Sequence, residues 1–225
     1  MNENYKWKGI TFNSMGVVIE ETPIMPKPKN NFTQYTIPGR NGFLAIDNKT
    51  YNSIPFTLKC HYNSENVNRD EVAAWLDGYG TLQIDGEKEY TGFISNTIPF
   101  EKVVRFRKFP VQFMLQPIAK ALETTTINAL EVDDFDSDTF VETYPIITIT
   151  GTGDISFSIN NINFTIYDAS GTYILDCEAK IITKNGINQS MNMSGDFPYI
   201  VNGNNSIVKS GNITAVSIEY KQTFI

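Results

Sequence analysis

The sequence predicts a mainly β protein with two domains, the second of them an antiparallel sandwich or jelly roll. First, a chain of 225 residues is long for one domain, and its 41% hydrophobic residues are enough to form two cores. Second, Phe, Tyr, Val, Ile and Thr are frequent, and these residues fit pleated, half-buried strands. Third, apolar residues alternate with polar ones in many short runs separated by Gly, Pro and Asn.

The first half is predicted to contain short strands separated by turns. Prolines between residues 23 and 28 mark a loop, because proline removes a ladder donor. The predicted strands are residues 11–12, 16–19, 33–37, 43–47 and 54–62. In the last of these, one face carries Ile54, Phe56, Leu58, Cys60 and Tyr62, which indicates a half-buried strand.

A tight turn is predicted between the strands at 33–37 and 43–47. It has the sequence Pro38-Gly39-Arg40-Asn41-Gly42. Pro-Gly and Asn-Gly pairs favour turns, because Pro fixes its own φ while Asn and Gly tolerate positive φ. The segment therefore predicts a turn after which the strand resumes.

One helix is predicted after Asn68, which can cap its N-terminus, with Glu71 placed as in a capping box. Its apolar stripe is Val72, Trp75 and Leu76, and Gly78 can provide the left-handed residue after its end. Strands are then predicted at 80–84, 89–98 and 100–115.

The strand at 100–115 begins with a cationic cluster interleaved with apolar residues. The cluster consists of Lys102, Arg105, Arg107 and Lys108. Alternation of this kind places the charges on one face of a strand. We interpret that face as solvated, with an anion or subunit contact as the alternative.

An acidic stretch at residues 131–138 marks a change in composition. It lacks the glycine and the terminal glutamate of an EF-hand loop, so we interpret it as a solvated linker. We expect an N-terminal domain at 1–125, an acidic linker at 126–140 and a C-terminal domain at 141–225. The last of these shows many short strands with no helix between them, including 145–150, 155–159, 173–178, 204–208 and 213–218.

Composition excludes several classes of function. The net charge of −7 and the absence of a broad basic face argue against nucleic-acid binding. His61 is the one histidine, and it is expected at the surface. A zinc site with several His or Cys ligands is therefore excluded, and a Ser-His-Asp triad could use no other histidine. We expect no catalytic residue, metal or cofactor. Cys60 and Cys177 are expected to be buried free thiols, and we expect neither a signal peptide nor a membrane anchor.

Two alternatives to a purely structural role remain. A glycosidase needs only two carboxylates. The candidate pairs are Asp176 with Glu178 and Asp85 with Glu87. A free-standing carbohydrate-binding sandwich needs exposed aromatic residues. The candidates for that role are Tyr167, Tyr173 and Tyr199.

Several segments, taken in order, resemble the distal tail protein family of siphophages. Four segments resemble the family's N-terminal domain: the start at 7–18, the turn at 37–42, the helix end at 75–82 and the Gln116-Pro117 pair. Five later segments resemble parts of the family's C-terminal domain: residues 144–151, Asp176-Cys177-Glu178, 195–198, 203–207 and 213–214. The resemblance covers nearly the whole chain.

The resemblance implies a ring-forming N-terminal domain and a galectin-like or jelly-roll C-terminal domain. Six copies would form a hexameric ring that joins the tail tube protein to the tail-tip hub protein of a phage or prophage tail, and receptor-binding proteins are further partners. DNA would pass through the ring without specific binding. The protein would be made in the bacterial cytoplasm and reside at the virion tail tip.

The ring contacts are expected in the first half of the chain. The candidates are Pro38, Gly39, Arg40, Asn41 and Gly42 at the predicted turn, with Arg105 and Arg107 on the cationic strand. This chain is short and shows no inserted carbohydrate-binding module. Direct binding of the host by this chain is therefore not expected.

Overall fold

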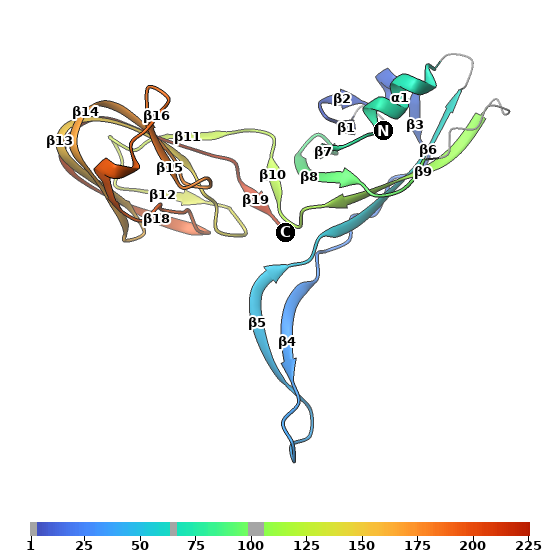
Figure 1. Ribbon diagram of the computed structural model, residues 1–225, viewed down its shortest axis with the longest axis horizontal. Helices are drawn as coiled ribbons and strands as arrows, with labels where there is room; N and C mark the ends of the chain where they lie inside the picture. Colours follow the sequence, from blue (N-terminus) through green and yellow to red (C-terminus); the bar gives the residue numbers. More distant parts are fainter. Residues whose placement is uncertain (1–3, 64–66, 99–105) are drawn as a thin grey trace. The chain divides into compact units, whose positions relative to one another are not determined.

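The structure is a computed structural model that describes residues 4–63, 67–98 and 106–225. It divides into two compact units, residues 1–119 with 225, and residues 120–224 (Figure 1). Antiparallel strands dominate both units, which confirms the prediction of a mainly β protein. No helix in the described part is long and apolar enough to cross a membrane.

The first unit is built on one antiparallel sheet with strand order β2-β1-β7-β8-β9-β6-β3. Its strands are β1 (Lys6–Trp7), β2 (Ile10–Thr11), β3 (Val17–Ile19), β6 (Ile54–Asn63), β7 (Tyr79–Ile84), β8 (Lys88–Ile94) and β9 (Phe106–Leu115). A separate hairpin joins β4 (Asn30–Tyr35) to β5 (Leu44–Tyr51).

Strand β6 carries the apolar face that its alternation predicted. It pairs with β9 from Ile54 opposite Leu115 to Asn63 opposite Phe106. The side chains of Ile54, Phe56, Leu58 and Cys60 are buried, as expected. The side chain of Tyr62, and the start of the predicted strand at 100–105, lie outside the described part.

Helix α1 (Arg69–Trp75) begins at the predicted cap. The Asn68 side chain accepts a hydrogen bond from the backbone N–H of Asp70 (3.1 Å). Glu71 differs from a capping box, because its carboxylate accepts from the Asn68 side-chain amide (2.9 Å). The φ of Gly78 is +74°, in the left-handed region expected after the helix.

Two tryptophans connect the helix to the sheet. Trp7 Nε1 donates to the Trp75 carbonyl and Trp75 Nε1 donates to the Trp7 carbonyl, both at 3.0 Å. Phe12 lies edge-on to Trp75 at 4.9 Å, and Phe113 lies edge-on to Trp7 at 5.2 Å. Both indole rings are therefore buried with their N–H groups hydrogen-bonded.

The second unit is an eight-stranded antiparallel sheet with order β11-β18-β13-β14-β15-β16, to which β12 and β17 are added. The strands are β11 (Thr125–Asn128), β12 (Asp134–Ser137), β13 (Ile146–Ile159), β14 (Ile162–Asp176), β15 (Ile181–Lys184), β16 (Ile187–Asn188), β17 (Met193–Gly195) and β18 (Gly203–Tyr220). Short strands β10 (Ala119–Ala121) and β19 (Thr223–Phe224) pair with each other.

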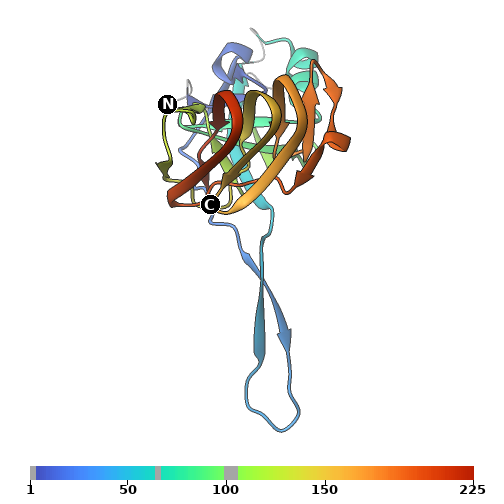
Figure 2. The ribbon, with the colours of Figure 1, turned by 90° about the vertical axis from the view of Figure 1, so that its left-hand side faces the viewer.

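Strands predicted as separate short runs are continuous in this unit. Residues 145–150 and 155–159 join in β13, and 204–208 and 213–218 join in β18. The strands bend at these points instead of ending, because Gly151 and Gly211 let the neighbouring backbone come close. A Cβ at Gly211, for example, would lie 2.3 Å from the Asp154 carbonyl oxygen. Figure 2 shows the resulting curvature of the long strands.

The acidic stretch differs from the solvated linker that composition predicted. Strands β11 and β12 both pair with β18, so residues 126–140 belong to the second unit, and the two units divide at Lys120. The reason is Lys209. Its ammonium donates to the carbonyls of Ala129, Leu130 and Val132 at 2.8–3.2 Å and lies 3.1 Å from the Asp133 carboxylate.

Both cysteines are buried and free, as predicted. Burial, with a smaller contribution from Glu20, raises the pKa of Cys60 to about 12. Burial, followed by Asp176, raises the pKa of Cys177 to about 12. Burial, followed by Asp85, likewise raises the pKa of Tyr5 to about 12.

These three groups predict a loss of stability in alkali. The ordinary pKa values are 9.0 for the thiols and 10.0 for Tyr5, so above pH 9 the unfolded chain releases protons before the folded chain does. Stability is therefore complete below pH 9 and falls as the pH rises toward 12. We expect a lower urea midpoint at about pH 11 than at about pH 8, with a smaller difference in the Cys60→Ala/Cys177→Ala double variant. Equal midpoints at the two pH values would contradict this assignment.

Candidate functional site

A two-stranded arm, residues 30–51, projects from the first unit (Figures 1 and 2). Strands β4 and β5 pair from Asn30 opposite Tyr51 to Tyr35 opposite Leu44, with a register shift between Asn30 and Phe32. The Asn52 N–H donates to the Lys29 carbonyl (2.9 Å) and closes the base. The arm pairs with no other strand of the described chain, so both of its outer strand edges are open.

Both faces of the arm carry exposed apolar side chains, Phe32 on one face and a stripe of three on the other. Tyr35 lies opposite Leu44, and Ile46 follows on the same face of β5. Their exposed fractions are 52%, 44% and 49%. Such residues normally help to form a core, so an exposed row of them marks a candidate contact surface.

The tip of the arm is the predicted turn Pro38-Gly39-Arg40-Asn41-Gly42. The Arg40 N–H donates to the Ile37 carbonyl (3.2 Å), and Gly39 and Gly42 have φ of +81° and +86°. All five residues are exposed. Their placement at the end of a projecting hairpin leaves them free to meet a partner.

The cationic strand is only partly described. Arg105 lies outside the described residues, and of Arg107 the structure gives the backbone, which pairs with Tyr62 in the β6–β9 ladder. The tip and this strand belong to different sheets. Lys108 is engaged, because its ammonium lies 3.0 Å from the Glu20 carboxylate.

His61 is half-buried and adjoins the same carboxylate. Its Nδ1 lies 3.3 Å from Glu20 Oε1, a contact too poorly aligned to satisfy the buried nitrogen as a hydrogen bond. The expected surface histidine is thus part of a Glu20–Lys108 cluster. Within the described residues no group of three His, Cys, Asp or Glu side chains could hold a metal ion.

Three of the four carboxylates considered for glycosidase chemistry have structural partners. Asp176 accepts from the Ala179 N–H (2.9 Å), and Glu178 pairs with Lys120 (2.8 Å). Asp85 has a φ of +54° in the turn between β7 and β8, where it interacts with Tyr5.

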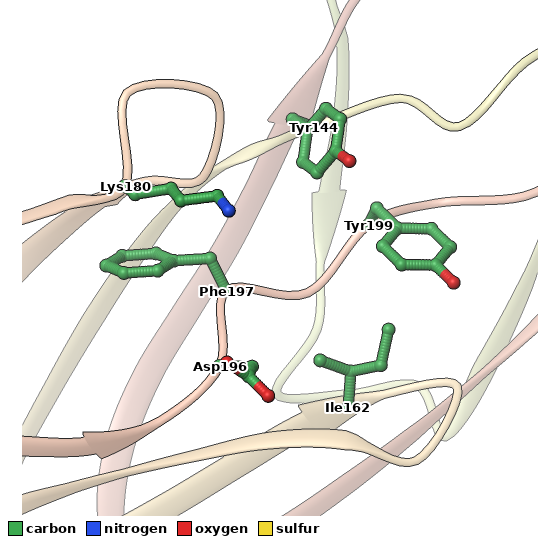
Figure 3. Close-up of a pocket in the computed structure, with 6 residues that line it drawn as sticks. All are labelled: Tyr144, Ile162, Lys180, Asp196, Phe197 and Tyr199. Atoms are coloured by element: carbon green, nitrogen blue, oxygen red, sulfur yellow. The ribbon is translucent and has the colours of Figure 1, made fainter.

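A small pocket of about 240 Å³ opens on the second unit (Figure 3). We call it the tyrosine pocket. It is lined by Tyr144, Ile162, Lys180, Asp196, Phe197 and Tyr199.

The aromatic candidates from the sequence separate in the structure. Tyr199 lines the tyrosine pocket, Tyr173 is buried in the core, and Tyr167 is exposed with its hydroxyl 3.0 Å from that of Ser194. Sequence reasoning missed Tyr144 and Phe197. The available signal was that both precede a proline, which holds an aromatic residue in extended backbone.

Three solved structures with a similar fold come from a phage hub apparatus and a phage baseplate. No family model matches the sequence, and no curated protein does either. The Dit protein of phage SPP1, described as a paradigm of the hub adsorption apparatus in phages infecting Gram-positive bacteria, matches with a TM-score of 0.77 and 11% identity, over 99% of each chain. The phage p2 baseplate in its activated conformation matches with TM-scores of 0.54 (with Sr, 8% identity) and 0.51 (with Ca, 6% identity). Both matches cover 94% of this chain and 92% of the other.

These likenesses establish the fold. The chain has the fold of a phage distal tail protein, which confirms the resemblance seen in the sequence.

Proposed function

We propose that this chain is a non-catalytic distal tail protein of a long, non-contractile phage or prophage tail. In this proposal six copies form a ring that joins the tail tube to the tail-tip hub. The observation that carries it is the likeness to SPP1 Dit over 99% of both chains, which includes both units.

The arm supports assembly into a larger particle. A two-stranded hairpin is marginally stable alone, because each strand lacks a second neighbour. Tyr35, Leu44 and Ile46 also remain exposed in the single chain. Packing this stripe against a neighbouring copy would remove apolar surface from water and satisfy the open strand edges.

The acidic composition is compatible with DNA passing through such a ring. A net charge of −7 disfavours adhesion of phosphate backbones, since like charges repel. The proposed partners are the tail tube protein, the tail-tip hub protein and receptor-binding proteins.

Light scattering of the purified chain, combined with negative-stain images of the same sample, tests the ring. We expect a mass near six times 25.4 kDa and particles with a central hole. Where the free chain is monomeric, addition of the tube and hub proteins should yield the ring. A monomer that also fails to join those partners would overturn the proposal.

Charging the apolar stripe should abolish ring formation while leaving the chain folded. In the Tyr35→Lys/Leu44→Lys variant two ammonium groups replace a directly paired apolar couple of the arm. Burial of these charges at an interface costs several kcal/mol, more than one exposed pair contributes in the free chain (roughly 1 kcal/mol). We therefore expect light scattering to show one subunit mass.

The matched control is Gln34→Lys/Ala45→Lys, which places the same two charges at a paired position on the opposite face of the arm. Repulsion between the two lysines is similar in both variants, so a difference in assembly would come from the face. The control should keep the ring. Identical behaviour of the two variants would show that the stripe is not the contact.

A further inference from the structure

The tyrosine pocket places aromatic ring faces beside one hydrogen-bond donor group and one acceptor group. We propose that it binds a single sugar ring, through stacking on the tyrosine wall and hydroxyl contacts to Lys180 and Asp196. Binding by this unit is independent of ring formation by the other. It provides a weak saccharide site on a protein whose proposed role is structural.

The aromatic wall is held by the backbone. Thr143 and Ile200 exchange two hydrogen bonds, Thr143 N–H to Ile200 O at 3.0 Å and Ile200 N–H to Thr143 O at 2.8 Å. The next residues, Tyr144 and Tyr199, therefore lie side by side, with ring centroids 5.9 Å apart and planes at 62°. A wall fixed in this way binds without a loss of backbone freedom.

The charged groups are positioned separately. The Asp196 N–H donates to the Asn163 carbonyl (3.0 Å), and Lys180 lies in a left-handed turn with φ +55°. In Figure 3 the Lys180 ammonium reaches into the space between Tyr144 and Phe197, and the Asp196 side chain lies on the side of Ile162. Neither group forms an ion pair anywhere in the described residues.

This combination selects a polyhydroxylated ring over other ligands. A carboxylate only accepts and an ammonium only donates, whereas a sugar hydroxyl does both, so one ring can satisfy the two groups. The C–H groups of the sugar carry partial positive charge and fit the negative face of an aromatic ring. A phosphate ligand would meet the Asp196 charge, and an apolar ligand would gain no hydrogen bond from either charged group.

The volume of the pocket limits the ligand to one ring. About 240 Å³ is below the roughly 300–1,000 Å³ typical of sites for larger ligands. Such a site buries little surface, so we expect dissociation constants in the millimolar range.

Saturation-transfer difference NMR on the full chain tests the proposal. The probes are glucose, galactose, rhamnose and N-acetylglucosamine, each added in millimolar amounts. We expect transfer to the ring protons of at least one sugar. Tyr199→Ala and Asp196→Asn should each weaken binding by an order of magnitude.

The control is Tyr167→Ala, which removes an exposed tyrosine of the same unit that does not line the tyrosine pocket. It should leave the sugar signals unchanged. Asp196 is exposed and Asn has its shape, so this variant keeps the fold even where Tyr199→Ala does not. Absence of transfer from all four sugars, or equal signals in wild type and Asp196→Asn, would overturn the site. Neither result would alter the mass expected for the ring.

Discussion

Replacing Asn205 with alanine should lower the free energy of unfolding of the second unit by about 3 kcal/mol or more. Asn205 is fully buried and uses its whole side-chain amide. Its Oδ1 accepts from Asn160 Nδ2 (2.7 Å) and from the Val201 N–H (2.9 Å). Its Nδ2 donates to the carbonyls of Val201 (2.9 Å) and Gly203 (2.8 Å).

The cost follows from the partners left behind. Alanine removes one hydrogen-bonding group but leaves four others without their partner, and each buried unsatisfied group costs about 1–3 kcal/mol. Asn160 also accepts from the Ser206 N–H (3.2 Å), so the loss extends to the turn between β13 and β14. That turn has φ of +53° and +65° at Asn160 and Asn161, values that Asn adopts more readily than most residues.

The two buried thiols allow each unit to be followed separately. Cys60 lies in the first unit and Cys177 in the second, and a thiol reacts only after local unfolding exposes it. In Asn205→Ala, mass spectrometry after alkylation should show faster labelling of Cys177 and unchanged labelling of Cys60. Asn204→Ala is the matched control, because Asn204 is the exposed neighbour on β18 and should label like wild type. Equal Cys177 rates in the two variants would mean that the amide network contributes little.

Local signals were sufficient for much of the first unit. The alternation of residues 54–62 predicted β6, and Asn68 and Gly78 marked the limits of helix α1, because these features depend on neighbours within a few residues. The same alternation predicted β4 and β5. It could not reveal that both faces of the arm are exposed, because a period of two shows which residues share a face but not what covers it.

Contacts between distant residues explain what the sequence could not predict. The acidic stretch becomes part of the sheet through Lys209, about 80 residues away. The tyrosine pocket likewise combines residues from separate segments: Tyr144, Ile162, Lys180, Asp196, Phe197 and Tyr199. In both places the residues that come together are far apart in the chain, and the local sequence around each of them does not indicate the contact.

Gly92→Ala should destabilise the first unit far more than Gly80→Ala, although the two glycines face each other across the β7–β8 ladder. A Cβ at Gly92 would lie 2.3 Å from the Met114 carbonyl oxygen and 2.9 Å from Leu115 Cα. No rotamer change can relieve a contact with backbone, so β8 and β9 must separate locally. We expect a loss of about 3 kcal/mol, the upper range for overpacking.

Gly80 has a different neighbour. A Cβ there would lie 2.7 Å from Lys8 Cγ, in an exposed, flexible side chain, and 3.3 Å from the Trp7 ring. The Lys8 side chain, whose ammonium contacts the Asp77 carbonyl and the Trp7 ring, must shift to make room. Alanine also restricts the unfolded chain more than glycine does, so we expect a net loss of no more than about 1 kcal/mol.

Tryptophan fluorescence measures this difference in the first unit alone. The chain has two tryptophans, Trp7 and Trp75, and both are buried in that unit. We expect the urea midpoint of Gly92→Ala to fall well below that of wild type, while Gly80→Ala stays close to it. Similar midpoints for the two variants would show that β9 can shift to make room. The close contact between β8 and β9 would then not explain the glycine at position 92.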